Sequence, residues 1–315
     1  MRAGTGKAVE PDLARLREPE VVEVADGVLA VVQYDGGWCL ANAGVIAGSR
    51  RTVVVDTMAT ERRARRLRAI VDSVARGPGM TVVNTHHHGD HTFGNFVFAE
   101  DATVLAHELT AKHMAELGLA LQSIWTGAEW GEVRLALPSQ TYRERHTLDD
   151  GDRAVEVLHV GPAHTPDDSV VHLPDEGVLF VGDVVLGGAT PFCLMGSVSG
   201  SLRAIERLRG LGARVLVPGH GPIGGPELLD EAEDYLRWIQ RLAGEGMAAG
   251  LEPLELARET DLGRFGALSE TERLVGNLAR AYAEAAGGAQ GAPLDVPKVF
   301  GDMVTYHGAM PDCHA

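Results

Sequence analysis

The chain has 315 residues, of which 44 are acidic and 28 are basic, so its formal charge at pH 7 is −16. The length allows one large domain or two modest ones, and the negative charge opposes binding to nucleic acid. Its three cysteines match neither a disulfide framework nor a cysteine-based zinc site. Because the sequence has no 18-residue apolar run and no signal-peptide core, we expect a cytoplasmic protein without a membrane partner.

The first part of the chain combines short strands with one amphipathic helix. Short β-branched segments bounded by glycine or aspartate predict strands at 21–24, 28–33, 45–47 and 51–56. Thr60 is placed to cap the helix that follows, and apolar residues recur on one face of that helix at Leu67, Ile70, Val71 and Val74. A second buried strand is predicted at 81–84.

The same order of elements returns later and then gives way to helices. Strands are predicted at 154–159, 178–181 and 214–217, with a helix at 201–211 before the last of them. After Pro226 the pattern predicts helices at 227–243, 253–258 and 269–286, then a linker at 287–297 and a short helix near Met303. Two β-rich halves, each ending in β-α-β, predict an α/β fold in which two sheets pack face to face with helices outside.

The segment THHHGDHTFGN, at 85–95, concentrates possible metal ligands directly after a buried strand. Ligands in α/β proteins bind beyond the carboxyl ends of strands, so the position is favourable. An extended pair at i and i+2 puts His86 and His88 on one side, while a turn through Gly89 can swing Asp90 and His91 toward a neighbouring position. This pattern predicts two metal ions rather than one.

Three more candidate ligands follow other strands: His164 in GPAHTPDDS, Asp183 in LFVGDVV and His220 in LVPGHGP. Each histidine alone would be better explained as an ordinary core or loop residue, but all seven positions together favour a metal site. Imidazole with carboxylate suits zinc first, and iron or manganese also remain candidates. His87 is interpreted as a neighbour of the ligands and not as a ligand itself.

These motifs resemble those of the metallo-β-lactamase fold superfamily over about residues 45–222. The resemblance implies an αββα sandwich of two mixed sheets, with a catalytic domain at 1–225 and a helical extension at 226–315. It implies a first Zn²⁺ held by His86, His88 and His164, and a second held by Asp90, His91 and His220. Asp183 would bridge the two ions. Because some β-lactamases carry cysteine at the bridging place, Asp183 disfavours that kind of antibiotic hydrolysis.

A narrower resemblance is to the second-ring cyclases of bacterial aromatic polyketide pathways, the actinorhodin type. It is carried by GGWCLANAG, VVNTHHHGDHTFGN, GPAHTPDD, TPFCLMGS, DYLRWIQRL and YHGAMPDC. It implies a zinc enzyme that closes the second ring of a carrier-bound polyketide by aldol condensation and then hydrolyses the thioester. A hydroxide or Asp90 would be the base. A hydroxyacyl-thioester hydrolase or lactonase is the nearest alternative, and a non-catalytic binding protein is a more distant one.

Bulky residues and a basic patch complete the candidate site. Trp38, Trp125, Trp130, Phe192 and Met195 lie in loops beside the motifs, and together they predict a pocket for a large organic substrate, although each singly fits an ordinary core.

Five arginines lie close together at Arg62, Arg63, Arg65, Arg66 and Arg68. A solvated helix face explains them, and the sharper hypothesis is docking of an acidic acyl carrier protein, with Arg62, Arg65 and Arg66 as the docking residues.

Overall fold

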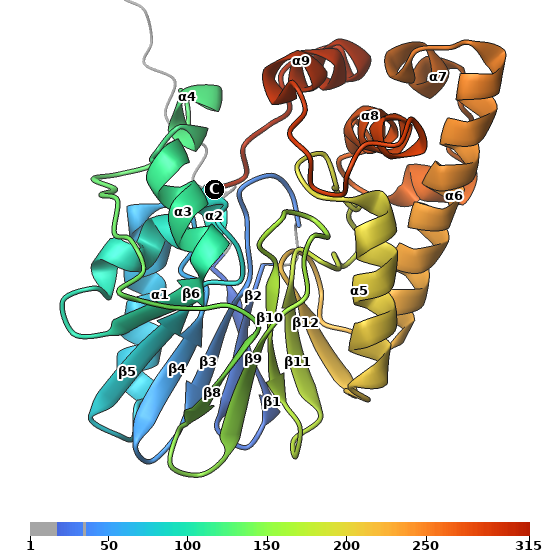
Figure 1. Ribbon diagram of the computed structural model, residues 1–315. Coiled ribbons are helices and arrows are strands. Elements are labelled where there is room, and N and C mark those ends of the chain that lie inside the picture. Colours follow the sequence, from blue (N-terminus) through green and yellow to red (C-terminus); the bar gives the residue numbers. More distant parts are fainter. Residues whose placement is uncertain (1–17, 34–35) are drawn as a thin grey trace, which may run out of the picture.

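The computed structural model describes residues 18–33 and 36–315, which form two β-sheets with helices outside them (Figure 1). The first sheet has seven strands in chain order: β1 Glu20–Ala25, β2 Val28–Val32, β3 Ala43–Ala47, β4 Arg51–Val55, β5 Gly79–Val83, β6 Thr103–His107 and β7 Gln140–Tyr142. The second has five strands in the order β12 Val215–Pro218, β11 Val178–Gly182, β10 Ser169–Leu173, β9 Ala154–His159 and β8 Arg145–Asp149. Both sheets are mixed, because β4 to β7 and the pair β11 and β12 are parallel while the other pairs are antiparallel.

The two sheets pack face to face through side chains that alternate along each strand. Val53 and Val55 of β4 join the core between the sheets, whereas Val54 faces the outer layer. On the second sheet, Phe180 of β11 faces the inner core and Val181 faces the opposite layer. Because side chains in a strand point to opposite faces in turn, both faces of each sheet are covered, and the predicted αββα sandwich is confirmed.

Helices cover the outer face of each sheet. On the seven-stranded side lie α1 Glu61–Val74, the short α2 Gly89–Thr92 and α3 Glu108–Leu117. On the five-stranded side lie α5 Val198–Gly210, α6 Glu227–Ala249, α7 Pro253–Glu259 and α8 Arg273–Ala285. α4 Leu121–Ile124 and α9 Val296–His307 lie above the end of the sandwich, where α9 packs on α7 and α8. Thr60 caps α1 as predicted, because its side chain accepts a hydrogen bond from the Arg63 backbone N–H.

Several elements differ from the sequence prediction. Strands β6, β7, β8 and β10 were not predicted, and the helix predicted at 201–211 begins at Val198, because Ser197 caps it by accepting from the Gly200 N–H. The helix predicted at 269–286 begins at Arg273, since the Ser269 backbone is bonded to Gly188 and Thr190 instead. The linker ends earlier than predicted, and the helix near Met303 is longer, at Val296–His307. No helix in the described ranges is long and apolar enough to cross a membrane.

The topology brings four strand ends to one edge of the sandwich. β11 and β12 run parallel, and β9 runs in the same direction because β10 is antiparallel to both β9 and β11. The carboxyl end of β5 reaches the same edge from the other sheet (Figure 1). The segments that follow these four strands therefore meet, although they come from distant parts of the sequence.

The C-terminal helices share a core with the five-stranded sheet. One apolar cluster contains Val181 and Leu216 from the strands together with Tyr235 of α6 and Leu278 of α8. Arg280 of α8, which is 1 % exposed, donates from Nε and Nη2 to the Leu194 carbonyl and from Nη1 to the Ala292 carbonyl. α8 therefore holds the loop that carries Phe192 and Met195. The division at residue 225 remains a prediction.

We expect Arg280→Met to destabilise the protein by about 2–4 kcal/mol, because methionine fills similar space but leaves the buried Leu194 carbonyl without its donors. Urea unfolding followed by circular dichroism measures the change. The control is Arg241→Met on α6, an exposed position that should change the free energy of unfolding by no more than about 0.5 kcal/mol. Equal unfolding midpoints for the two variants would refute the bracing role of Arg280.

Candidate metal centre

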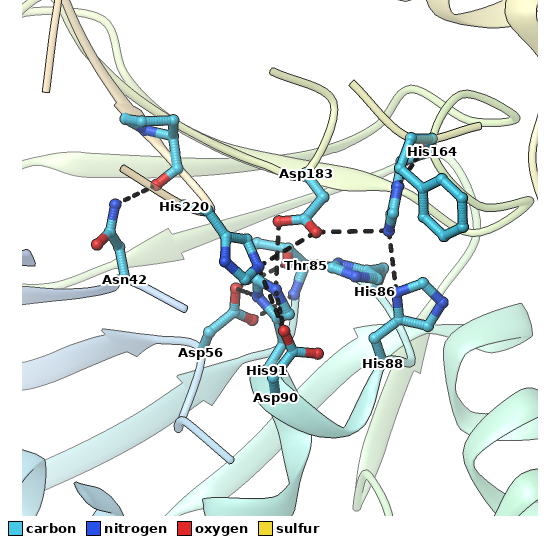
Figure 2. A network of polar contacts seen from close by, with 12 residues as sticks. Asn42, Asp56, Thr85, His86, His88, Asp90, His91, His164, Asp183 and His220 are labelled. Carbon is cyan, nitrogen blue, oxygen red and sulfur yellow. Dashed lines mark hydrogen bonds and ion pairs between the residues drawn. The ribbon is translucent and has the colours of Figure 1, made fainter. Parts of the chain in front are cut away.

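The seven predicted ligand residues converge at this edge of the sandwich (Figure 2). They form two groups in which the possible ligand atoms lie within 4.8 Å of one another: His86, His88, His164 and Asp183 in one group, and Asp90, His91 and His220 in the other. In the first group His164 Nε2 lies 2.9 Å from His88 Nδ1 and 3.4 Å from Asp183 Oδ2. These groups match the two ligand sets implied by the sequence resemblance.

Asp183 lies between the two groups. Its Oδ1 is 3.2 Å from His91 Nε2, and its Oδ2 is 3.5 Å from His220 Nε2. Within the second group, His220 Nε2 lies 3.2 Å from Asp90 Oδ2. One carboxylate thus faces both groups, which is the position required of a bridging ligand, and the cluster is compatible with a dinuclear site.

Hydrogen bonds behind the ligands orient three of the imidazole rings. His91 Nδ1 donates to Asp56 Oδ2 at 2.8 Å, and His86 Nδ1 lies 3.1 Å from Thr85 Oγ1, which itself donates to Asp56. His164 Nδ1 donates to the Phe192 carbonyl. With the proton held on Nδ1, each ring directs the lone pair of Nε2 toward the cluster. Asp56 was not predicted as a site residue, although its place directly after a buried strand was a usable signal.

Backbone contacts fix the loops that carry His164 and His220. The Thr165 N–H and hydroxyl both donate to Asp168, at 2.8 and 2.7 Å, which closes the turn after His164. Asn42 Nδ2 donates to the carbonyls of Pro218 and Gly221 on either side of His220, both at 2.8 Å, and Figure 2 shows the first of these bonds. These hydrogen bonds fix the two loops of the second sheet that carry His164 and His220.

Two glycines make room for the centre. A side chain at Gly219 would collide with the Asp183 carboxylate, so this glycine allows the bridging residue to sit close to β12. The turn at Gly89 directs Asp90 and His91 toward the second ligand group, as predicted, although Gly89 is the first residue of α2 and its φ is not positive. A Cβ at Gly89 would instead collide with the Phe93 ring, so the glycine is needed for packing space.

Positive charge close to the buried carboxylates stabilises the cluster. Burial alone would raise the pKa of Asp183, but the imidazoles of His220 and His91 outweigh it and hold the pKa well below its usual value. Burial alone would lower the pKa of His220, but the Asp183 and Asp90 carboxylates raise it to about 9. Burial keeps the pKa values of His86 and His88 well below the usual range, so those two imidazoles are neutral. Neutral imidazoles and ionised carboxylates are the forms that bind metal ions.

The same side chains have buried ligand atoms that suit metal ions. His86 Nε2 and His88 Nε2 are buried and have no hydrogen-bond partner, and a third atom, His91 Nε2, has only Asp183 Oδ1 beside it, at 3.2 Å. Leaving a buried polar atom without a partner costs about 1–3 kcal/mol, so such atoms in a native protein call for an explanation. Coordination of two cations would supply a partner to all three, and the nitrogen and carboxylate donors suit zinc.

A cavity opens directly over the cluster. Its wall includes four of the five residues predicted to form a pocket, Trp38, Trp125, Phe192 and Met195, together with the ligands His88, Asp90, His164, Asp183 and His220. The rings of Trp38 and Phe192 lie 5.4 Å apart, and those of Trp38 and Trp125 lie 5.6 Å apart. Trp130 does not line this cavity and packs on Phe93 in an adjacent core cluster.

Helices supply cavity residues that the sequence prediction missed. Leu117 of α3 and Ile124 of α4 are 50 % and 41 % exposed and belong to the cavity lining, as do Val296 and Phe300 of α9. Arg273 at the start of α8 also lines the cavity. Helical periodicity predicted the C-terminal helices, but it could not show which of their side chains face a cavity formed by other segments.

His87 belongs to a third polar group beside the cluster. Its Nδ1 donates to Asp167 Oδ1 at 2.8 Å, and His113 Nδ1 donates to the same oxygen at 2.9 Å. The Thr110 hydroxyl donates to the other oxygen of Asp167 at 2.8 Å. His87 lies outside the two groups that contain the seven predicted ligands, in keeping with its interpretation as a neighbour.

The arginines of α1 have separate roles. Arg63 is buried and donates to Gln33 Oε1, and Arg68 pairs with Asp101 and Asp72. Arg62, Arg65 and Arg66 are exposed, with Arg65 paired to Glu61 and Arg66 paired to Glu18. The exposed basic face is therefore smaller than the run of five arginines indicated.

Comparison with known proteins identifies relatives of this chain. The family model of the Metallo-beta-lactamase superfamily matches residues 36–220. The alpha subunit of a 2,4-dinitroanisole O-demethylase from Nocardioides sp. is 31 % identical over 207 residues, covering 62 % of this chain and 54 % of that protein. An acyl-coenzyme A thioesterase, MBLAC2 of Bos taurus, is 27 % identical over 245 residues, covering 68 % of this chain and 85 % of that protein.

The solved structures agree on the fold. A metallo-beta-lactamase from Pontibacter korlensis superposes with a TM-score of 0.59 at 24 % identity, covering 70 % of this chain and 99 % of that one. The chain spans about half the length of the O-demethylase subunit, so that protein matches over a shared region and not as a whole.

We expect Asp56→Asn to weaken the binding of one of two zinc equivalents by about 10–100-fold. Oδ2 of Asp56 accepts from His91 and from the Thr85 hydroxyl, and Oδ1 accepts from the Thr85 backbone N–H, so the NH2 group of asparagine would face a donor in either orientation. Competition with a fluorescent zinc chelator measures the affinity, and circular dichroism reports whether the fold is retained. Asp175→Asn, an exposed aspartate after β10, is the matched control. Unchanged affinity for both equivalents in Asp56→Asn would contradict the orienting role.

Proposed function

The chain belongs to the metallo-β-lactamase superfamily, and from that membership and from its cavity we propose that it is a dinuclear zinc enzyme that hydrolyses a thioester. The observation that carries the proposal is the position of the ligand cluster on the wall of an apolar, aromatic cavity. Such a cavity suits a large acyl group, whose reacting carbonyl would lie at the cluster. The similarity to a protein named an acyl-coenzyme A thioesterase supports the same reaction type.

Zinc ions held by the two ligand groups would supply Lewis-acid activation of water and of the thioester carbonyl. The chain itself supplies the binding surface. Trp38, Trp125 and Phe192 would hold the acyl group and exclude bulk water, since aromatic rings bury large area with little loss of rotamer freedom. Leu117 and Ile124 form an apolar rim along which the substrate would enter.

Asp90 is proposed as the proton acceptor of the chain. It lines the cavity, and its Oδ2 lies 3.2 Å from His220 Nε2. Burial alone would raise the pKa of Asp90, but the imidazoles of His91 and His220 outweigh it and lower the pKa, so the group is ionised at neutral pH. In hydrolysis the oxygen of water bonds to the acyl carbon, the C–S bond breaks, and the proton released from water is transferred by way of Asp90 to the leaving thiolate.

The finer proposal is that the thioester is a polyketide and that ring closure precedes its release. A carbon between two carbonyls would lose a proton to Asp90, attack a ketone carbon of the same chain and form a β-hydroxy ketone after the alkoxide gains that proton. Support comes from the resemblance over the C-terminal third and from the contribution of that third to the cavity through Val296 and Phe300. A folded, ring-forming chain needs a cavity of the kind that these helices help to build.

An acyl carrier protein is the proposed partner, with α1 as its docking surface. Arg62, Arg65 and Arg66 line a surface hollow together with Glu18. The ion pairs of Arg65 and Arg66 involve side chains that are 60 % and 57 % exposed, and such pairs contribute about 0–1 kcal/mol. Acidic side chains of a partner would replace Glu61 and Glu18 as the ion-pair partners of Arg65 and Arg66 at a small cost in free energy.

The proposed reaction is tested with a poly-β-ketone thioester of N-acetylcysteamine and with a simple acyl thioester. We expect the zinc-loaded protein to release thiol from both and to release a cyclised acid from the first, as measured by mass spectrometry. Asp90→Asn should reduce both rates by at least about 100-fold, while the surface control Asp175→Asn should not. If the poly-β-ketone thioester yields only uncyclised acid, the function is thioester hydrolysis without ring closure. Release of no thiol would refute both proposals, and hydrolysis of lactones in that case would favour a lactonase.

Charge reversal tests the docking surface. The double variant Arg65→Glu/Arg66→Glu should raise KM for a carrier-bound thioester by about 10-fold, since like charges at an interface slow association, and leave KM for the N-acetylcysteamine thioester unchanged. Arg237→Glu on α6, also an exposed and ion-paired arginine, is the control. An equal loss on both substrates would show that the effect is not one of docking.

A further inference from the structure

Arg273 places a buried positive charge in an otherwise largely apolar part of the cavity wall. It begins α8, the residue is 3 % exposed, and it lines the same cavity as the ligand residues Asp183 and His164. It belongs to neither ligand group and lies outside residues 36–220, which the family model matches. A buried arginine is rare unless something pairs with it, so its position calls for a partner.

The guanidinium lies close to two aromatic rings. Its central carbon lies 4.2 Å from the centre of the Trp38 ring and 5.8 Å from that of Phe192. Trp38 is fixed in turn, because its Nε1 donates to Glu272 Oε1 at 2.6 Å and its backbone N–H donates to Glu270 Oε1. The attraction between a cation and an aromatic ring uses none of the N–H donors of the guanidinium.

One edge of the guanidinium lacks a protein partner. Nη1 donates to the Thr190 carbonyl at 3.1 Å. Nε is buried without a hydrogen bond, and the described residues accept none from Nη2. Nε and Nη2 together form the side-on edge that pairs with two oxygens of a planar anion. A buried donor without an acceptor is unfavourable, so an anion that reached this edge from the cavity would be stabilised by it.

The acidic neighbours of Arg273 in sequence make their polar contacts with other residues, although the positive charge of Arg273 opposes the effect of burial on the pKa of Glu270. Glu272 accepts from Trp38 and has its other oxygen 3.6 Å from His307 Nδ1, and Glu270 lies 3.9 Å from His314 Nε2. Among the residues that the structure describes, no carboxylate forms an ion pair with Arg273 within 4.0 Å. Burial raises the pKa of Glu270 to about 7, which further limits the negative charge that this residue offers.

We propose that Arg273 is a specificity residue that binds a delocalised oxygen anion of the substrate, either a carboxylate on the acyl chain or the enolate of a 1,3-dicarbonyl. Both present two oxygens in one plane, which matches the free edge of the guanidinium. This inference rests on the proposed function, and it adds that the substrate is not a purely hydrocarbon acyl thioester. Arg273 would hold one end of the acyl group while the thioester lies at the ligand cluster.

Three N-acetylcysteamine thioesters with acyl chains of equal length test the inference, one ending in a carboxylate, one in a 1,3-diketone and one in a methyl group. Arg273→Met should lower kcat/KM for one or both oxygen-bearing substrates by about 10–100-fold and change it less than about threefold for the methyl-ended one. Arg273→Lys should restore part of the loss, since it keeps the charge without the paired donors. Arg264→Met is the control, because Arg264 also stacks on an aromatic ring, Phe265, but lies outside the cavity.

Each result decides a separate point. A loss confined to the carboxylate or to the diketone substrate identifies which anion is bound. An equal loss on all three substrates, with a lower urea midpoint, would show that Arg273 only braces the Thr190 loop and would overturn the inference. If the wild-type protein hydrolyses none of them, the proposed function fails. Calorimetric binding of the corresponding thioethers then tests Arg273 alone: weaker binding of the oxygen-bearing thioethers by Arg273→Met supports the inference, and unchanged binding overturns it.

Discussion

Two carboxylates buried side by side set the main constraint on this protein. Asp90 and Asp183 lie among imidazoles at the end of the sandwich, where little water reaches them. Like charges in such a place repel each other unless positive charge is close, and the cost grows as the local dielectric falls. Without metal, protonated His91 and His220 supply this positive charge, because the pKa values of both imidazoles are raised. Two divalent ions would meet it with more charge and would also use the buried ring nitrogens that lack partners.

The sandwich and the C-terminal helices make different contributions to the site. The sheets bring the ligand loops to one edge, and hydrogen bonds from Asp56 and Asn42 hold the loops in place. The helices close the cavity over them and determine its chemical character. α8 has two arginines with distinct tasks, since Arg280 braces the loop that carries Phe192 and Arg273 faces the cavity.

This division explains why membership of the superfamily leaves the substrate open. The relatives of this chain include an O-demethylase subunit and an acyl-coenzyme A thioesterase, so one scaffold supports different reactions. The ligand cluster can activate water or a carbonyl for many substrates. Selection among them depends on the cavity wall, which here combines aromatic rings with one buried cation.

The sequence by itself determined the layers of the fold and the seven residues of the cluster, because these depend on local patterns. Val53, Val54 and Val55 mark a strand buried on both sides, and H-x-H-x-D-H after a strand marks ligands wherever that strand lies. Strands such as β7 and β8 were missed because they are short and largely polar, so pairing with a neighbour, and not periodicity, makes them strands. Asp56 and Arg273 acquire their roles only through contacts with segments far away in the chain. The tertiary structure alone decides such roles, because the direction of a side chain and the dielectric around it depend on neighbours that local sequence does not specify.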